Sequence, residues 1–331
     1  MGLKSRLMLA IAASCFASGA AFASIDEICA AGASEPKLIW YSSQDPSRND
    51  AALAAFRKAY PKITIEAFRL ATGQLAIRYA SERQAGVINA DIISLADPNF
   101  IADGFGKDWF VQFAKTDLPA LAALDDRWFQ KGSATTSISV LGYGYNSQMV
   151  GAKPPATWND LLRPEYAGKI ILGDPRAVPS YMALFRILKE ELGEEFFTKL
   201  AAQKPVLVPS VVPATQQLAA GEVAIVVPSV LTTLRLLKLE GAPIEFVAPS
   251  PTTGNEFETV LSKGADSPNA AKCLYNFLFT EAGQKAYNGP TSVSPLANIP
   301  DTAPMPATYI NPRILELPQY KDQIVKALGL K

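Results

Sequence analysis

The chain has 331 residues and carries 31 basic and 31 acidic side chains, so it lacks the basic excess that marks a nucleic-acid-binding surface. It contains no histidine, which excludes Ser-His-Asp and Cys-His catalysis and every zinc or iron site that needs imidazole. The length is close to the size at which a single hydrophobic core stops growing, so we expect two lobes.

Residues 1–23 have the pattern of a secretory signal peptide. Lys4 and Arg6 form a short basic start, and no residue from 7 to 23 is charged. Ala21-Phe22-Ala23 places small residues at both positions that signal peptidase reads, which predicts cleavage after Ala23 and export to the periplasm. A lipoprotein with Cys15 as the lipidated residue is the alternative, although position 12 is alanine rather than the usual leucine.

The mature chain would lose Lys4 and Arg6, which leaves 29 basic and 31 acidic residues and a net charge of −2. It would keep two cysteines, Cys29 and Cys273, each in a helix-like stretch near one end of the chain. Thiols often pair in an oxidising compartment. We therefore hypothesise a disulfide that ties the N-terminus to a late helix; two separate buried thiols are the alternative.

Strands and helices alternate through the first part of the chain. Short apolar runs predict strands, and apolar residues at helical spacing predict helices that stop at Pro61 and Gly86. Strands separated by helices of this length are typical of parallel βαβ units. The predicted strands cover 37–42, 63–68 and 91–96, and the predicted helices cover 49–60 and 72–85.

An extended stretch over 137–146 leads to a second alternating series, which begins after Pro154-Pro155. We therefore predict an α/β fold with one lobe from 24–140 and 256–300, a second from 141–255, and a proline-rich C-terminal extension, 301–331, packed on them. The strands of this part are predicted over 168–173, 206–208, 223–227, 244–247 and 257–262, and the helices over 179–192, 213–220, 231–239 and 267–286.

Small and polar residues follow several predicted strands, and open parallel sheets bind ligands beyond the carboxyl ends of their strands. Arg176 follows a strand and precedes a helix, so its guanidinium can hold a carboxylate, phosphate or phosphonate in a two-pronged contact; an interlobe or surface ion pair is the alternative. Asp97 would favour a cationic group instead, unless it caps the next helix. The candidate ligand-binding residues are Ser42, Ser43, Thr72, Gly73, Asp97, Tyr143, Arg176, Ser180, Tyr181 and Ser229.

The other candidates also have structural alternatives. Ser42 and Ser43 end the first strand, where they bind the ligand or cap a helix near Asn49. Thr72 and Gly73 begin a helix whose amides suit an anion, although a plain N-cap explains Thr72 equally well. Tyr143 lies in the extended stretch, where it stacks on a ligand or packs in the hinge. Together the assignments favour a small, polar, anionic organic molecule.

Several fragments, taken in their order and spacing, resemble the type II periplasmic solute-binding proteins of ABC importers. The resemblance covers nearly the whole mature chain and is closest to the branch that holds ferric-iron, thiamine, phosphonate and sugar-phosphate binders. The fragments are Tyr41-Ser42-Ser43, Ala90-Asp91-Ile92-Ile93, Tyr143-Gly144-Tyr145-Asn146, Thr157-Trp158-Asn159-Asp160-Leu161-Leu162, Tyr166-Ala167-Gly168-Lys169-Ile170, Asp174-Pro175-Arg176, Leu218-Ala219-Ala220-Gly221-Glu222, Asn269-Ala270-Ala271-Lys272 and Glu281-Ala282-Gly283-Gln284.

The resemblance implies a Venus-flytrap fold, in which two lobes close on a ligand by a hinge motion of two strands near Val140–Tyr145 and Val247–Thr259. It implies a binding protein with no catalytic residues and no cofactor, which hands a small molecule to an ABC permease in the inner membrane. We expect a monomer with no nucleic-acid partner. A sensor subunit that presents its ligand to a membrane receptor, and an enzyme on the same fold, are the competing functions.

One departure from the branch bears on the ligand. Its ferric binders generally carry two adjacent tyrosines after the strand equivalent to 223–227, and this chain has Pro228-Ser229-Val230 there. Bare ferric iron needs hard anionic ligands, and this chain has no Tyr-Tyr pair. We therefore predict no metal ligand and keep ferric iron or a ferric complex as the alternative to an organic solute.

Overall fold

The computed structural model describes residues 24–330. The predicted signal peptide, its cleavage site and the lipidation alternative at Cys15 lie outside these residues or at their edge. Within residues 24–330, none of the helices combines the length and apolarity that a membrane span requires.

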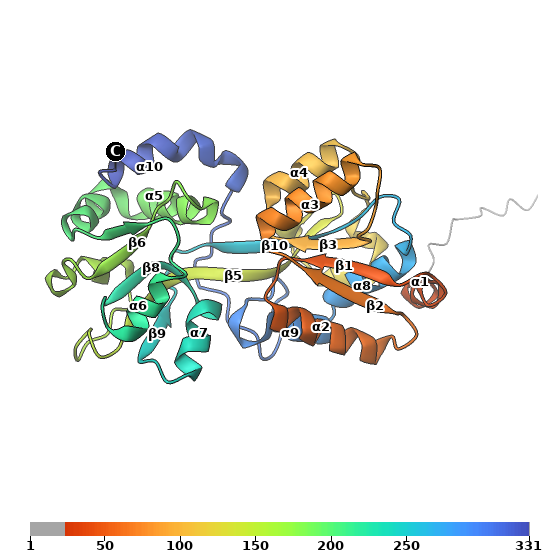
Figure 1. The fold of residues 1–331 in the computed structure, drawn as a ribbon, viewed down its shortest axis with the longest axis horizontal. Helices are drawn as coiled ribbons and strands as arrows, with labels where there is room; N and C mark the ends of the chain where they lie inside the picture. The colour runs from red at the N-terminus through yellow and green to blue at the C-terminus, as the bar shows by residue number, and fades with distance from the viewer. Residues whose placement is uncertain (1–23, 331) are drawn as a thin grey trace, which may run out of the picture.

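Two groups of strands form the framework, and they share one long strand (Figure 1). At one end the order is β2-β1-β3-β10-β5; β1 pairs in parallel with β2 and β3, whereas β10 is antiparallel to β3 and β5. At the other end β5 pairs with β8 and β9, and β6 lies parallel to β8 and β7. The strands are β1 Leu38–Ser42, β2 Ile65–Arg69, β3 Ile92–Leu95, β4 Phe129–Gln130, β5 Ser133–Asn146, β6 Ile170–Gly173, β7 Val206–Val208, β8 Ile225–Val230, β9 Ile244–Val247 and β10 Gly254–Leu261.

Helices cover both faces of each group of strands (Figure 1). Because successive side chains of a strand point to opposite faces, Trp40 lies in the core beneath α2, α8 and α9, while its neighbour Tyr41 lies in the core beneath α3 and α4. A third core, around Tyr143, Phe185 and Phe197, holds the other end together. The helices are α1 Ile25–Gly32, α2 Pro46–Ala59, α3 Thr72–Gln84, α4 Pro98–Gly106, α5 Pro179–Ala202, α6 Ala214–Ala220, α7 Leu231–Leu239, α8 Pro268–Leu278, α9 Glu281–Asn288 and α10 Lys321–Ala327.

The sequence prediction of one helix over 267–286 was wrong in detail, because two helices occupy this stretch. Thr280 separates them: its hydroxyl donates to the carbonyl of Phe277 and accepts from the amide of Gly283, at 2.7 and 3.1 Å. This cap ends α8 and starts α9. The predicted helix over 179–192 instead continues to Ala202, because Gly193 adopts a positive φ of 79° and redirects the chain into a second helical segment.

The chain crosses between the two ends along β5 and again between Val247 and Gly254. It crosses a third time near its C-terminus, because a short helix, Ile314–Tyr320, and α10 pack on α5 at the second end, and Ile314–Tyr320 also contacts α4 at the first (Figure 1). The predicted hinge segments coincide with the first two crossings.

Gly142 lies where β5 enters the second end, and it allows β9 to approach closely. A Cβ atom at this position would meet the carbonyl oxygen of Val247 at 2.0 Å, which is backbone and cannot rotate away. We expect Gly142→Ala to lower the free energy of unfolding by about 1–3 kcal/mol, measured by urea denaturation. The control is Gly106→Ala in α4, where a Cβ has open space and alanine favours the helix; equal stability losses in both variants would contradict the packing argument.

Candidate functional site

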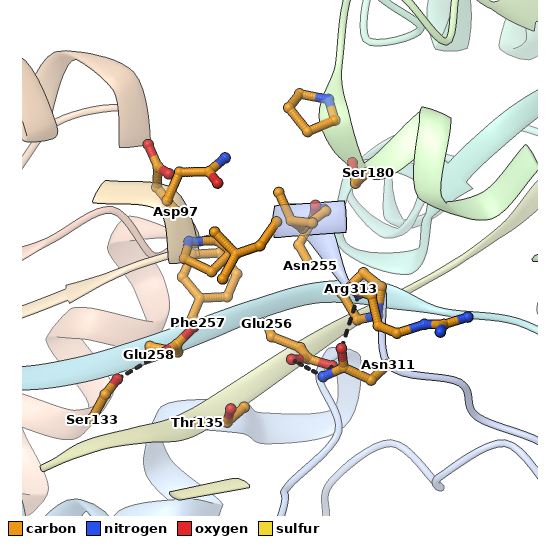
Figure 2. A pocket seen from close by; sticks show the side chains of 18 of the residues that line it. Asp97, Ser133, Thr135, Ser180, Asn255, Glu256, Phe257, Glu258, Asn311 and Arg313 are labelled. Atoms are coloured by element: carbon orange, nitrogen blue, oxygen red, sulfur yellow. Dashed lines mark hydrogen bonds between the residues drawn. The ribbon is translucent and has the colours of Figure 1, made fainter. Parts of the chain in front are cut away.

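A pocket of about 730 Å³ lies between the two ends of the molecule. Its walls come from the residues after the carboxyl end of β3, the start of α3 and α5, residues 127–130, parts of β5 and β10, and the C-terminal segment 311–316 (Figure 2). This volume lies within the 300–1,000 Å³ that small-molecule sites typically have, so the pocket suits an organic ligand rather than a bare ion. It is the position at which open α/β sheets bind ligands.

Two glutamates of β10 form the floor of the pocket. Glu256 and Glu258 are two residues apart on one strand, so their side chains project from the same face of the sheet (Figure 2). The carboxylate of Glu256 accepts hydrogen bonds from the Tyr309 hydroxyl at 2.8 Å and from the Asn311 amide at 2.9 Å. The carboxylate of Glu258 accepts one from the Ser133 hydroxyl.

Burial controls the ionisation of both glutamates. Loss of solvation, together with the neighbouring charge of Glu258, raises the pKa of Glu256 to about 7 against the opposing hydrogen bonds from Tyr309 and Asn311 and the charge of Arg127. Burial also raises the pKa of Glu258, with Asp97 adding a second unfavourable negative charge. Glu258 therefore lies close enough to Glu256 and to Asp97 for the charges to repel.

Four of the sequence-predicted residues line the pocket: Thr72, Gly73, Asp97 and Ser180. Asp97 also caps α4, since one carboxylate oxygen accepts from the amide of Phe100 at 3.0 Å. Thr72 is the first residue of α3 rather than its N-cap, which is Ala71. These four come from both ends of the molecule, so the structure brings together residues that lie more than a hundred positions apart.

The other predicted residues do not line the pocket in this structure. Ser43 lies directly behind it and accepts a hydrogen bond from Thr72 at 3.0 Å. Ser42 is in the core and donates to Asn49 at 2.8 Å. Ser229 donates to the carbonyl of Val226 at 2.9 Å.

The two predicted tyrosines and the predicted arginine also have structural contacts. Tyr143 is fully buried, donates to the carbonyl of Thr157 at 3.1 Å, and stays neutral because burial raises its pKa. Tyr181 packs against Gly173, in the third core. Arg176 forms a bidentate pair with Asp174, at 2.9 and 2.8 Å, and lies outside the pocket lining. Its role in ligand binding stays a prediction.

Sequence reasoning did not select Glu256, Glu258, Thr135 or Asn311, all of which line the pocket. One signal in the sequence pointed to the glutamates. Glu256 lies just before the predicted strand 257–262 and Glu258 lies within it, so these alternate positions put both side chains on the same face of the sheet. A charged residue on a strand that pairs on both sides is rare unless it has a function. No signal in the sequence pointed to Asn311, because it reaches the pocket only through the third crossing of the chain between the two ends of the molecule.

The fold and the pocket together define a type II periplasmic binding protein, a two-lobed protein that binds a solute between its lobes. The sequence profile of the family described as bacterial extracellular solute-binding protein matches residues 49–289, which is more than half of the chain. The chain belongs to this family. It is therefore a solute-binding protein rather than an enzyme. No curated protein sequence matches it.

Solved structures support the fold. The periplasmic binding protein AfuA from Actinobacillus pleuropneumoniae, with fructose-6-phosphate bound, is similar with a TM-score of 0.62 and 20% identity, covering 89% of this chain and 99% of that one. Iron-bound HitA from Pseudomonas aeruginosa gives 0.67 and 17%, covering 89% and 100%. The spermidine/putrescine transporter protein PotD from Streptococcus pneumoniae gives 0.62 and 17%, covering 81% and 85%. At these identities the likeness concerns the fold alone.

Proposed function

We propose that this protein captures a small polar organic solute in the pocket between its lobes and delivers it to an ABC permease in the inner membrane. The observation that carries the proposal is the pocket itself, because residues of both lobes line it. A ligand that contacts Asp97 from one lobe and Ser180 from the other would hold the lobes together. The permease can then distinguish the loaded protein from the empty one by its shape.

We propose a hinge motion about the two crossings at 140–145 and 247–259, between a lobe of 24–140 with 256–300 and a lobe of 141–255. The segment from 301 onward packs on the second lobe through α10 and α5. Lobes connected by a few strand residues can rotate with little disturbance of their cores, and hinge closure around a ligand is a known motion of binding proteins.

We propose that the mature protein begins at Ser24 and acts in the periplasm as a monomer. Its disulfide supports an oxidising compartment. Ser24 caps α1, accepting from the amide of Glu27 at 3.2 Å, so the proposed cleavage point lies directly before the N-cap of this helix. N-terminal sequencing of the exported protein tests the cleavage after Ala23.

The proposed function predicts ligand-dependent compaction. In a thermal-shift screen, a bound solute at about one hundred times its dissociation constant should stabilise the mature protein by about 2.7 kcal/mol. Small-angle scattering should then show a smaller radius of gyration with that solute than without it. A solute that stabilises strongly without any compaction would contradict closure, and catalytic turnover of a bound solute would contradict a pure binding role.

The same thermal-shift screen distinguishes the alternative classes of ligand. The anionic solute predicted from the sequence depends on Arg176, and ferric iron is named for some structural neighbours. Within residues 24–330 no three His, Cys, Asp or Glu side chains form a group suited to a metal ion. A role as a sensor subunit would keep the same closure, and a co-purifying permease distinguishes import from sensing.

A further inference from the structure

We propose that the pocket selects an organic cation, a small molecule carrying one or more ammonium groups, which Glu256, Glu258 and Asp97 hold through their carboxylates. This inference rests on the proposed function, because it assigns the chemical class of the solute to the same pocket. The three carboxylates thus take the place of the Arg176 guanidinium as the groups expected to pair with the charge of the ligand.

These three carboxylates of the pocket have no cationic partner in the part of the chain that the structure describes. Glu256 and Glu258 lie about 7 Å apart along one face of β10, given the rise of a strand, and Asp97 follows the neighbouring strand β3 (Figure 2). Within residues 24–330 no lysine or arginine forms an ion pair with any of these three carboxylates. Half-buried carboxylates that repel one another are complementary to a positive ligand.

The two arginines of the pocket lining, Arg127 and Arg313, already contact other side chains. Arg127 lies 3.8 Å from Asp125 and stacks over the ring of Trp128 at 4.6 Å. Arg313 contacts Glu316 at 3.4 Å and Glu190 at 3.5 Å. The lining as a whole carries four carboxylates and two guanidiniums, so its net charge favours a cation when the carboxylates are ionised.

A hydroxyl without a hydrogen-bond partner in the described part of the chain also lies at the wall of the pocket. Thr135 lies opposite Glu258 on the adjacent strand β5, lines the pocket, and is only 4% exposed. Among the described residues its hydroxyl has no hydrogen-bond partner, and its oxygen stays accessible from the pocket. A ligand N–H group beside Glu258 would supply that partner, since a hydroxyl oxygen can accept it.

The lining also provides surfaces for the rest of such a ligand. Three aromatic residues, Trp128, Phe129 and Phe257, contribute to the lining of the pocket. Aromatic faces attract ammonium groups and cover aliphatic carbon. Two carboxylates at alternate positions of one strand, together with these apolar residues, fit an ammonium group on a short aliphatic chain better than they fit a phosphate or a carboxylate.

The test compares three classes of probe by isothermal titration calorimetry at pH 8. The amine class is 1,3-diaminopropane, 1,4-diaminobutane, spermidine and choline; the anion class is fructose 6-phosphate, inorganic phosphate and citrate; the iron class is ferric citrate. We expect saturable binding only in the amine class. Glu256→Gln and Glu258→Gln should each weaken it at least tenfold, whereas Glu195→Gln, on the exposed face of α5, and Arg176→Ala should leave it unchanged.

Both glutamine variants keep the volume of the side chain, and circular dichroism of each variant checks that it folds. Binding of an anion that Arg176→Ala weakens tenfold would overturn the inference, as would ferric binding or an amine affinity that both glutamine variants retain. These results would leave the proposed function intact if the bound probe compacts the protein in scattering. If no probe or wider solute library produced binding with compaction, the proposed function itself would fail.

Discussion

Replacing Cys29 and Cys273 together by alanine is expected to lower the free energy of unfolding by about 2–4 kcal/mol. The disulfide joins α1 to α8 across 244 positions of the sequence. It therefore restricts the unfolded chain over a very long loop, which is the case where the loop-entropy model gives its largest values. Both sulfur-bearing side chains are buried, at 5% and 0% exposure, so the variant also loses packing between the two helices.

Urea denaturation of the mature protein, with and without reductant, measures the effect. Reduction of the wild type should reproduce the loss, and the double-alanine variant should not respond to reductant. The N-terminal segment keeps other contacts with α8: Glu35 accepts from the amides of Asn269 and Ala270, at 3.0 and 2.8 Å. The variant should therefore still fold. Two free thiols in the untreated wild-type protein would contradict the bond.

The general architecture could be predicted because local signals dominate it. The alternation of apolar strands and amphipathic helices placed β1, β2 and β3 and most helices within a few residues. A break such as the one at Thr280 escaped prediction, because a single hydroxyl cap in a helix-like stretch leaves the apolar period intact. The family resemblance, carried by fragments such as Asp174-Pro175-Arg176, is confirmed by the profile match.

The candidate site was only partly predictable for a different physical reason. Rules about strand ends found Thr72, Asp97 and Ser180, because every parallel strand ends at the same edge. They cannot say which way a long side chain turns: Arg176 folds back on Asp174, two residues earlier. The glutamates of β10 lie on the facing side of an antiparallel strand, where no strand-end rule applies.

The pocket also depends on a contact that the sequence could not indicate. Asn311 and Tyr309 reach Glu256 from the C-terminal segment, more than fifty residues further along the chain. These hydrogen bonds hold the Glu256 carboxylate in place at the pocket floor, and the rest of the pocket stays open to a ligand. The same segment then packs on α5, so it connects the floor of the pocket to the second lobe. Closure would have to move this connection together with the hinge strands.

The strongest pH effect on the ligand-free protein should come from the pocket glutamates. Burial raises the pKa of Glu256 to about 7 in the folded protein, above the ordinary value of 4.5. A group of this kind stabilises the fold fully below its unfolded pKa, and the stabilisation is lost as the pH rises through its folded pKa. Between about pH 4.5 and pH 7 the folded protein should therefore lose on the order of 1–3 kcal/mol from this group. Glu258 acts in the same direction.

The difference between wild type and Glu256→Gln isolates this contribution, because other carboxyls act in the opposite sense. Hydrogen bonds from backbone amides and from Thr157 and Arg163 lower the pKa of Asp160, so its stabilisation is lost as the pH falls. We expect Glu256→Gln to match the wild type at pH 5 and to exceed its free energy of unfolding at pH 8. Parallel stability curves from pH 5 to pH 8 would contradict it.

The ligand should reverse this trend, which joins stability to binding. A cation that pairs with ionised Glu256 favours the charged form, so an amine should protect the wild type more at pH 8 than at pH 5. The titratable and polar groups that face Glu256 are Glu258, Arg127, Tyr309 and Asn311. The protection by an amine should therefore grow with pH in the wild type and stay nearly flat in the Glu256→Gln, Glu258→Gln double variant. The protein is least stable when the pocket is empty and its glutamates are ionised. A positive ligand relieves this destabilisation, which therefore contributes to the free energy of binding at neutral pH.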